Sequence, residues 1–227
     1  FSVALKGELQ FENANLGGGP SIDGVQVGGA VGTSAAAKNG APHYNDGTMY
    51  QRAWSVNGFT YGLGTKITEE LLASWVAGGR VNDGTYTVDC SGFVGFTLGL
   101  SGGTSESQLA GSNNLKAVVT LDANTLQAGD VIGADHGPTS FDGGRKYGID
   151  HIAVVIQDPA TKALYLAESH GGHGVRIRSI AEGVSAWNSR MAKNFKNGTT
   201  YLDSTTGTVK AYTHYVGNYR PATTTTA

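Results

Sequence analysis

A single cysteine, Cys90, lies between Asp89 and Ser91. A lone cysteine forms no disulfide within its chain and builds no cysteine cage for a metal, so the thiol is either a small buried apolar group or a nucleophile. Turn-forming residues before it give way to an apolar pattern after it, in which Phe93 and Phe96 recur at helical spacing. A helix that begins at Cys90 would direct backbone N–H groups at the sulfur, and such groups stabilise a thiolate or an oxyanion. This position favours the nucleophile.

The base for such a thiol is predicted at His151, which opens the most apolar strand-like run of the chain, residues 151–156. In a strand, Ala153 and Val155 would share the face of His151. A histidine at the start of a strand, flanked by small residues, can face a thiol across a groove. The alternative is a histidine that only ends the strand. The pair predicts a cysteine nucleophile with a histidine acting as general base and then as general acid.

A third polar residue is needed to orient the imidazole. Alternation from Leu164 and Leu166 puts Glu168 and His170 on one face of the next strand, so either could reach His151. We favour Glu168, because a carboxylate fixes the tautomer and stabilises the imidazolium. The competing interpretation of Glu168 is a surface carboxylate at the end of a strand.

Periodicity and turn residues predict the elements that would position these groups. Helices are expected over residues 68–76, from residue 90 onward and over 187–195, and strands over 117–121, 130–132, 151–156, 163–167, 175–180 and 212–219. Helices first and an antiparallel sheet afterwards predict an α+β domain.

Composition divides the chain into three parts. Residues 1–50 are rich in Gly, Asn, Ala and Ser and are interpreted as an N-terminal extension, with the hypothesis that it lies across the groove as an inhibitory or specificity element. Residues 51–221 form the predicted catalytic domain, and residues 222–227 a Thr-rich linker or tail that could lead to further domains. The start at Phe1, without a Met or an apolar signal segment, is typical of a mature fragment or an excised domain.

Charge and hydropathy exclude several functions. The 227 residues carry a formal net charge of -2 with 15% charged residues, so there is no basic footprint for nucleic acid. No apolar run approaches the ~18 residues that span a bilayer. His170 and His173 resemble half of a zinc site, but no third ligand follows at suitable spacing, and no metal or other cofactor is expected.

Three ordered segments resemble the NlpC/P60 family of papain-like cell-wall cysteine peptidases. They are Asp89-Cys-Ser-Gly-Phe-Val94, Leu126-Gln-Ala-Gly-Asp-Val131 and His151-Ile-Ala-Val-Val155. In that family an Asp-Cys-Ser-Gly motif opens the nucleophile helix, a Leu-x-x-Gly-Asp turn leads into the sheet, and a His begins the next strand. The resemblance implies a papain-like fold in which the nucleophile helix packs on a small antiparallel sheet.

The resemblance also implies an activity. It is hydrolysis of an amide bond in peptidoglycan stem peptides or cross-bridges through a thioester acyl-enzyme, with Cys90 as nucleophile and His151 as base. The expected location is secreted or attached to the cell wall, with delivery into a target periplasm also open, and an inhibitor or immunity protein is a possible partner. Two alternatives remain: a papain-like acyltransferase that uses the same thiol, and a non-catalytic wall-binding module in which the thiol is buried.

Substrate-binding residues are expected around the nucleophile. Members of the family carry a tyrosine before the Cys motif whose hydroxyl helps bind the oxyanion or the substrate amine. Tyr61 is its nearest counterpart here and Tyr86 the alternative, while Asp89 and Ser91 flank the nucleophile. The loop predicted over residues 133–150 is longer than a strand connection needs, which is typical of recognition loops. Its polar residues include Asp135, His136, Asp142 and Arg145.

Overall fold

A computed structural model describes residues 21–22, 25–26, 46–77, 86–100, 103–135, 147–196, 200–203, 208–211 and 213–220. Most of the predicted extension, the loop residues His136, Asp142 and Arg145, and the Thr-rich tail therefore lie outside the described residues. So does the proposed placement of the extension across the groove.

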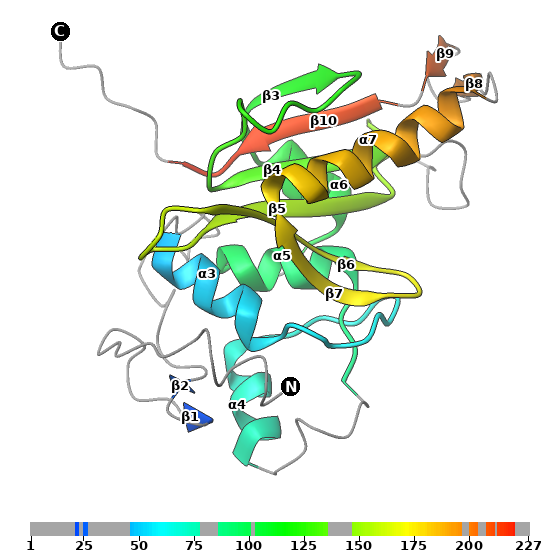
Figure 1. The fold of residues 1–227 in the computed structure, drawn as a ribbon. Helices are drawn as coiled ribbons and strands as arrows, with labels where there is room; N and C mark the ends of the chain where they lie inside the picture. The colour runs from blue at the N-terminus through cyan, green and yellow to red at the C-terminus, as the bar shows by residue number, and fades with distance from the viewer. Residues whose placement is uncertain are drawn as a thin grey trace, which may run out of the picture.

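The centre of the fold is a six-stranded sheet in which every neighbouring pair is antiparallel (Figure 1). In spatial order its strands are β3 (Asn113–Val118), β10 (Thr213–Asn218), β4 (Asp130–Asp135), β5 (His151–Gln157), β6 (Leu164–His170) and β7 (Gly174–Ser179). Two small hairpins stand apart from it, β1 (Ser21–Ile22) with β2 (Val25–Gln26) and β8 (Thr200–Asp203) with β9 (Thr208–Ala211). The protein is thus mixed α/β with an antiparallel sheet, compatible with the predicted α+β class.

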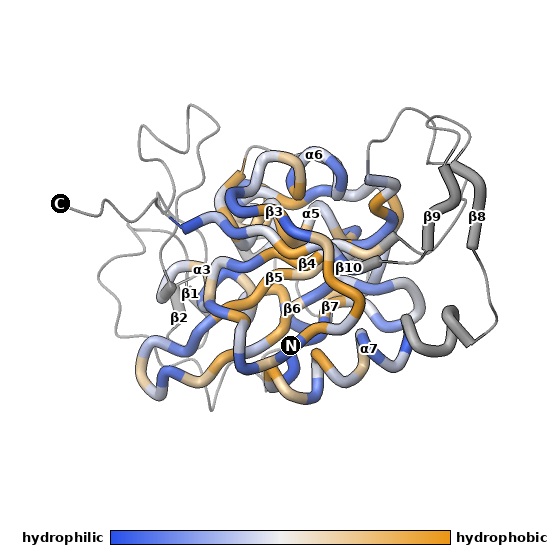
Figure 2. The backbone as a smooth tube through the Cα atoms, turned by 90° about the horizontal axis from the view of Figure 1, so that it is seen from above, coloured by the Kyte–Doolittle hydropathy of each residue, from blue (hydrophilic) through white to orange (hydrophobic). Residues whose placement is uncertain are grey.

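Helices cover both faces of this sheet. The described helices are α3 (Asp46–Ser55), α4 (Glu69–Ala77), α5 (Cys90–Leu98), α6 (Ser105–Ala110) and α7 (Ile180–Lys196), of which α4 lies away from the sheet (Figure 1). Helix α5 packs against β5, β6 and α3, and α6 packs against β4, whereas α7 packs against β6 and β7. Figure 2 shows α5 and α6 on one side of the sheet and α7 on the other.

Alternate side chains of strand β5 belong to two hydrophobic clusters, one on each face of the sheet. Ile152, Val154 and Ile156 belong to a cluster that includes residues of α3 and α5. Ala153 and Val155 belong to a second cluster that includes Trp187 of α7. Because side chains alternate along a strand, His151 points to the face of Ala153, as the alternation predicts. The base is therefore on the α7 side of the sheet, while the nucleophile helix covers the other side.

The predicted helices at residue 68 and at Cys90 and five of the six predicted strands are confirmed with small changes of boundary. The strand predicted over 117–121 is wrong in part, since β3 ends at Val118. Beyond it the backbone N–H of Leu121 donates to Asn188 Oδ1 at 2.9 Å, and its carbonyl accepts from Asn188 Nδ2 at 2.9 Å. The Asn188 side chain of α7 thus makes the hydrogen bonds to Leu121 that a neighbouring strand would have made.

The ends of two predicted segments also differ from the structure. Ile180 starts α7 rather than ending β7, so the helix predicted over 187–195 is longer than expected. Strand β4 runs to Asp135, into the loop predicted from residue 133.

The domain boundary predicted at residue 50 falls inside α3, which the sequence reading missed. Met49 and Tyr50 of this helix are buried in the core. Polar residues of this helix, among them Gln51 and Arg52, are buried together with the apolar ones, so its apolar pattern is weak.

Candidate active site

Cys90 is the first residue of α5, and both ends of this helix are capped. Asp89 accepts a hydrogen bond from the backbone N–H of Gly92 at 2.5 Å, and Gly99 ends the helix in the left-handed region, at φ 72°. Every residue of the helix is buried. The position of the sulfur is therefore fixed by a cap at one end of the helix and by core packing along it.

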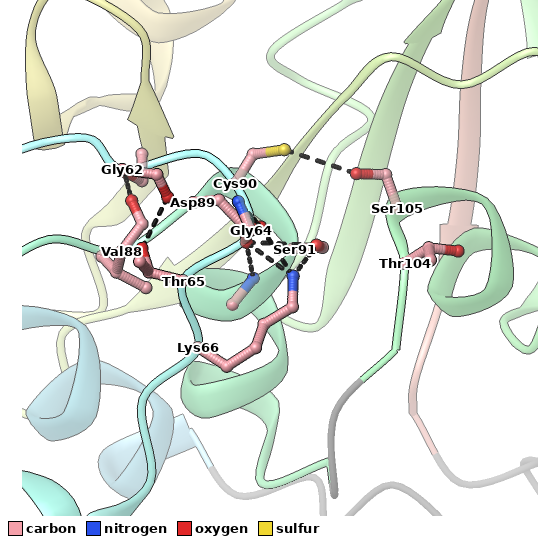
Figure 3. Close-up of polar contacts among 12 residues, drawn as sticks. Gly62, Gly64, Thr65, Lys66, Val88, Asp89, Cys90, Ser91, Thr104 and Ser105 are labelled. Carbon is pink, nitrogen blue, oxygen red and sulfur yellow. Dashed lines mark hydrogen bonds and ion pairs between the residues drawn. The ribbon is translucent and has the colours of Figure 1, made fainter. Parts of the chain in front are cut away.

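The flanking residues Asp89 and Ser91 form a polar cluster with Lys66 (Figure 3). Lys66 Nζ donates to Asp89 Oδ1 at 2.7 Å and to Ser91 Oγ at 2.5 Å, and the backbone N–H of Gly64 donates to Asp89 Oδ2 at 3.0 Å. Both side chains are buried. Both residues are predicted to bind substrate, and their contacts in the structure join the loop at residues 62–66 to the start of the nucleophile helix.

The thiol lies among three polar groups. Cys90 Sγ is 3.4 Å from Ser105 Oγ and 4.0 Å from the carbonyl oxygen of Asp150 (Figure 3 shows the contact with Ser105). Burial raises the pKa of the Cys90 thiol, but a hydrogen bond with His151 and the charge of its imidazolium outweigh burial and hold the pKa below its ordinary value. The contact with Ser105 lowers it further. The thiol is thus shifted toward thiolate.

His151 joins the thiol to a buried carboxylate. Its Nε2 is 2.8 Å from Glu168 Oε2, which leaves Nδ1 to face Cys90. Burial lowers the pKa of His151, but hydrogen bonds to Cys90 and Glu168 outweigh it and raise the pKa to about 9. Burial raises the pKa of the Glu168 carboxyl, whereas the hydrogen bond and charge of His151 hold it far below its usual range. The shifts favour the charged form of each group: a thiolate at Cys90, an imidazolium at His151 and a carboxylate at Glu168. We call these three groups, in this order, the catalytic line.

Trp187 covers this line from α7. Its Nε1–H donates to Glu168 Oε2 at 3.1 Å, and its ring stacks on the imidazole of His151 with centroids 5.3 Å apart and planes 25° apart. The tryptophan therefore restrains base and carboxylate together and keeps water from the hydrogen bond between them.

Of the two candidates for the third residue, Glu168 makes the hydrogen bond to His151. His170 instead sets its ring edge against the imidazole, with centroids 5.0 Å apart and planes 85° apart, and its Nδ1 bonds to the carbonyl of Gly171 at 2.7 Å. Burial, followed by the charges of His151 and Arg190, lowers the pKa of His170 to about 4. A neutral imidazole beside the base can line the site. It carries no negative charge that would stabilise the imidazolium of His151.

The two tyrosine candidates are far from equivalent. Burial, the charge of Cys90 and the charge of Asp89 raise the pKa of Tyr61 to about 12, which indicates a hydroxyl close to the nucleophile. Tyr86 instead stacks on Trp75 with centroids 4.2 Å apart, and within the described residues its buried hydroxyl has no hydrogen-bond partner. The charge interaction with Cys90 favours Tyr61 over Tyr86 as the predicted substrate contact.

Helix α6 is the element of the site that sequence reasoning missed. Thr104 caps it through a reciprocal pair of hydrogen bonds with Ser107, which brings Ser105 to the thiol. The carboxylate of Glu106 accepts from the backbone N–H groups of Tyr147 at 2.7 Å and Ile149 at 3.1 Å, in the segment that leads to His151. The capping pattern at residues 104–107 was the signal that could have identified it.

Two further features concern the described part of the chain. No cluster of three or more His, Cys, Asp and Glu residues there could hold a metal ion. In the same residues no helix has the length and apolar character to cross a membrane.

In comparison with known proteins, no protein-family model matches the chain, and no curated protein matches it significantly.

Proposed function

We propose that this protein is a cysteine peptidase or amidase of the NlpC/P60 type, with a papain-like arrangement of helix and sheet. The observation that carries the proposal is the line from Cys90 through His151 to Glu168, in which the pKa of the thiol is lowered and that of the imidazole is raised. Such opposite shifts favour an ion pair, which is the reactive form of a cysteine hydrolase.

Acylation follows from this ion pair. The thiolate of Cys90 attacks the carbonyl carbon of an amide, and a C–S bond forms as the carbonyl π electrons move to oxygen. The imidazolium of His151 then protonates the amide nitrogen, the C–N bond breaks, and the amine leaves. Glu168 keeps the imidazole in the orientation and tautomer that this proton transfer requires.

Hydrolysis of the thioester restores the enzyme. His151, now neutral, takes a proton from water as the oxygen attacks the acyl carbon, and the C–S bond breaks to leave a carboxylic acid and the thiolate. The backbone N–H groups of Cys90 and Ser91 at the start of α5 and the Tyr61 hydroxyl are the donors available to the oxyanion, because Asp89 accepts from the N–H groups of Gly92 and Phe93.

The substrate class rests on the resemblance of the three sequence segments to cell-wall peptidases. We propose an amide bond of a peptidoglycan stem peptide or cross-bridge as the bond cleaved, in a protein that acts outside the cytoplasm. An acyltransferase would share the acylation step and differ only in the acceptor, an amine in place of water.

The test is digestion of purified sacculi, with release of muropeptides followed by mass spectrometry. Wild-type protein should release them, and Cys90→Ala should release none while keeping the wild-type melting temperature to within a few degrees. Lys116→Gln is the control, because Lys116 is exposed on β3, at the edge of the sheet opposite β7. Equal release by Cys90→Ala would contradict the proposal.

Two additions separate the alternatives. An added amine acceptor that appears in the products would indicate acyl transfer. A thiol that iodoacetamide alkylates slowly, with the pH dependence of an ordinary cysteine, would favour a non-catalytic module.

A further inference from the structure

Three arginines converge on the one carboxylate of the candidate site. Arg176 Nη2 is 3.0 Å from Glu168 Oε1, Arg178 Nη1 is 3.7 Å from the same oxygen, and Arg190 Nη2 is 3.9 Å from Glu168 Oε2. Arg176 and Arg178 come from β7, and Arg190 comes from α7. We name Arg176, Arg178 and Arg190 the arginine cluster.

The arginine cluster carries more positive charge than Glu168 neutralises. Within the described residues, Glu168 is the only carboxylate at ion-pair distance from any of the three guanidinium groups. The same carboxylate also hydrogen-bonds with His151 and Trp187, so it has three hydrogen-bond partners, with Arg176 the third, and two further ion pairs, with Arg178 and Arg190. Three guanidinium charges and one carboxylate leave an excess of two positive charges, before the imidazolium of His151 is counted.

Hydrogen-bond donors of the arginine cluster are also unused. Arg176 Nε and Arg190 Nη1 are buried atoms for which the described part of the chain supplies no acceptor. The three side chains nevertheless keep 22%, 26% and 25% of their surface exposed, so a solute can reach them. Buried N–H groups without acceptors, next to excess positive charge, are features of an anion-binding site.

The arginine cluster borders the reacting groups. The Arg190 guanidinium lies over the ring of Trp187, 5.5 Å from its centroid, and the imidazole of His151 stacks on the same ring. The ring of His214 also contacts Trp187, with centroids 5.9 Å apart. The charge of Arg190 also reaches His170, whose ring contacts His151. An anion held here would lie beside the base, at the side of the site away from α5.

We infer that the arginine cluster binds a carboxylate group of the substrate, so that the enzyme selects acidic peptides with a free carboxylate near the scissile amide. The planar fork of a guanidinium matches a carboxylate through two parallel hydrogen bonds, which a lone charge does not offer. This inference rests on the proposed function, because it assigns a substrate feature to the same site. Glu168 takes part as the group that holds the arginines together.

The test compares two synthetic stem peptides that are identical except that one has a free α-carboxylate, and the other a carboxamide, on the residue next to the scissile bond. Wild-type kcat/KM should favour the carboxylate peptide by about tenfold or more, because a site built to bind a polar group rejects the analogue that lacks it. Arg178→Gln and Arg190→Gln should bring this ratio close to one, mainly through KM. Lys116→Gln should keep the wild-type ratio.

A purely structural role of the arginines predicts a different result. If they serve only to hold Glu168, the substitutions lower kcat/KM for both peptides equally and the ratio stays at its wild-type value, which would overturn the inference. A wild-type ratio of one would overturn it as well.

Binding measurements keep this inference separate from the proposed function. Calorimetric titration of Cys90→Ala with both peptides needs no turnover. If wild type cleaves neither peptide, the proposed function fails, while tighter binding of the carboxylate peptide, lost in Arg178→Gln on the Cys90→Ala background, still supports the arginine cluster as a carboxylate site. Equal binding of both peptides, or none, overturns it.

Discussion

At the scale of single residues, the site depends on where two protons reside. The thiol of Cys90 is buried, which by itself opposes ionisation, yet His151 and Ser105 reverse that effect. His151 is buried too, and it is held protonated by the negative charges on either side of it. Each charged group is therefore stabilised by its neighbours, and removing one of them should change the titration of the others.

The first prediction at this scale concerns pH. Because the pKa of Cys90 is lowered and that of His151 is raised to about 9, kcat/KM should rise with pH below the ordinary thiol range, as the thiolate forms, and fall near pH 9, as the imidazolium loses its proton. Glu168→Gln removes the carboxylate charge that holds this proton, so the alkaline limb should move to lower pH. Measurement of kcat/KM and of iodoacetamide alkylation from pH 4 to pH 10 checks both statements.

A substitution of His170 is the matched control for Glu168→Gln. His170→Asn changes a ring that contacts His151 without the hydrogen bond that Glu168 makes, so its alkaline limb should stay closer to wild type than that of Glu168→Gln. The reverse order of the two variants would make His170 the orienting residue.

At the scale of elements, the short helix α6 connects nucleophile and base. Its first residue, Ser105, contacts the thiol, and its second, Glu106, holds the backbone N–H groups of Tyr147 and Ile149. These lie just before His151, where β5 begins. The helix thus fixes the distance between two catalytic groups that belong to opposite sides of the sheet.

The prediction for this element is that Glu106→Ala lowers both stability and turnover. The substitution leaves two N–H groups without their acceptor, at a cost of about 1–3 kcal/mol for each one that stays buried. The loosened segment should let His151 move away from the thiol, which lowers kcat more than it raises KM. Thermal melting and steady-state kinetics measure the two effects. Glu106→Gln keeps one acceptor oxygen and should lie between wild type and Glu106→Ala, and an unchanged kcat in Glu106→Ala would argue against this role.

At the scale of the whole molecule, the site lies where the two helical layers meet across the sheet. Helices α5 and α6 bring Cys90 and Ser105 from one side, and α7 brings Trp187 and the arginine of the cluster from the other. Strands β5 and β6 contribute His151 and Glu168 between them. The line of catalytic groups is therefore complete only when both layers are packed on the sheet.

The packing of α7 can be tested at Gly183. A Cβ added there would lie 2.5 Å from Leu166 Cβ and 2.9 Å from Leu166 Cδ2, so Gly183→Ala must push the helix away from β6. We expect a loss of about 1–3 kcal/mol of unfolding free energy, as for other overpacked cores. Activity should fall as well, because Trp187 moves with the helix. Ser185→Ala, at an exposed position of the same helix, is the control, and denaturant unfolding gives the measurement. Equal stability of the two variants would mean that α7 adapts without strain.

Local patterns in the sequence were sufficient to predict the main parts of the fold. The turn-forming residues before Cys90, the apolar run after it and the alternation in residues 151–156 depend on neighbours within a few positions, and the corresponding helix and strand are confirmed. The face of His151 on β5 followed from the same alternation. Helices α3 and α6 were missed because polar residues occupy many of their buried positions, among them Gln51 and Arg52 in α3 and Ser105 and Gln108 in α6.

The sequence by itself determined which residue types are available for chemistry: one thiol, a histidine at the start of an apolar strand, and a glutamate or histidine on the next. Only the tertiary structure decided between Glu168 and His170, because both share a face of β6 and the choice depends on how Trp187 and the arginine cluster are packed against that face. The same holds for Ser105, which reaches the thiol from another helix, and for the charge interaction between Cys90 and Tyr61. Contacts of this kind depend on the packing of whole elements, which the spacing of residues along one element does not encode.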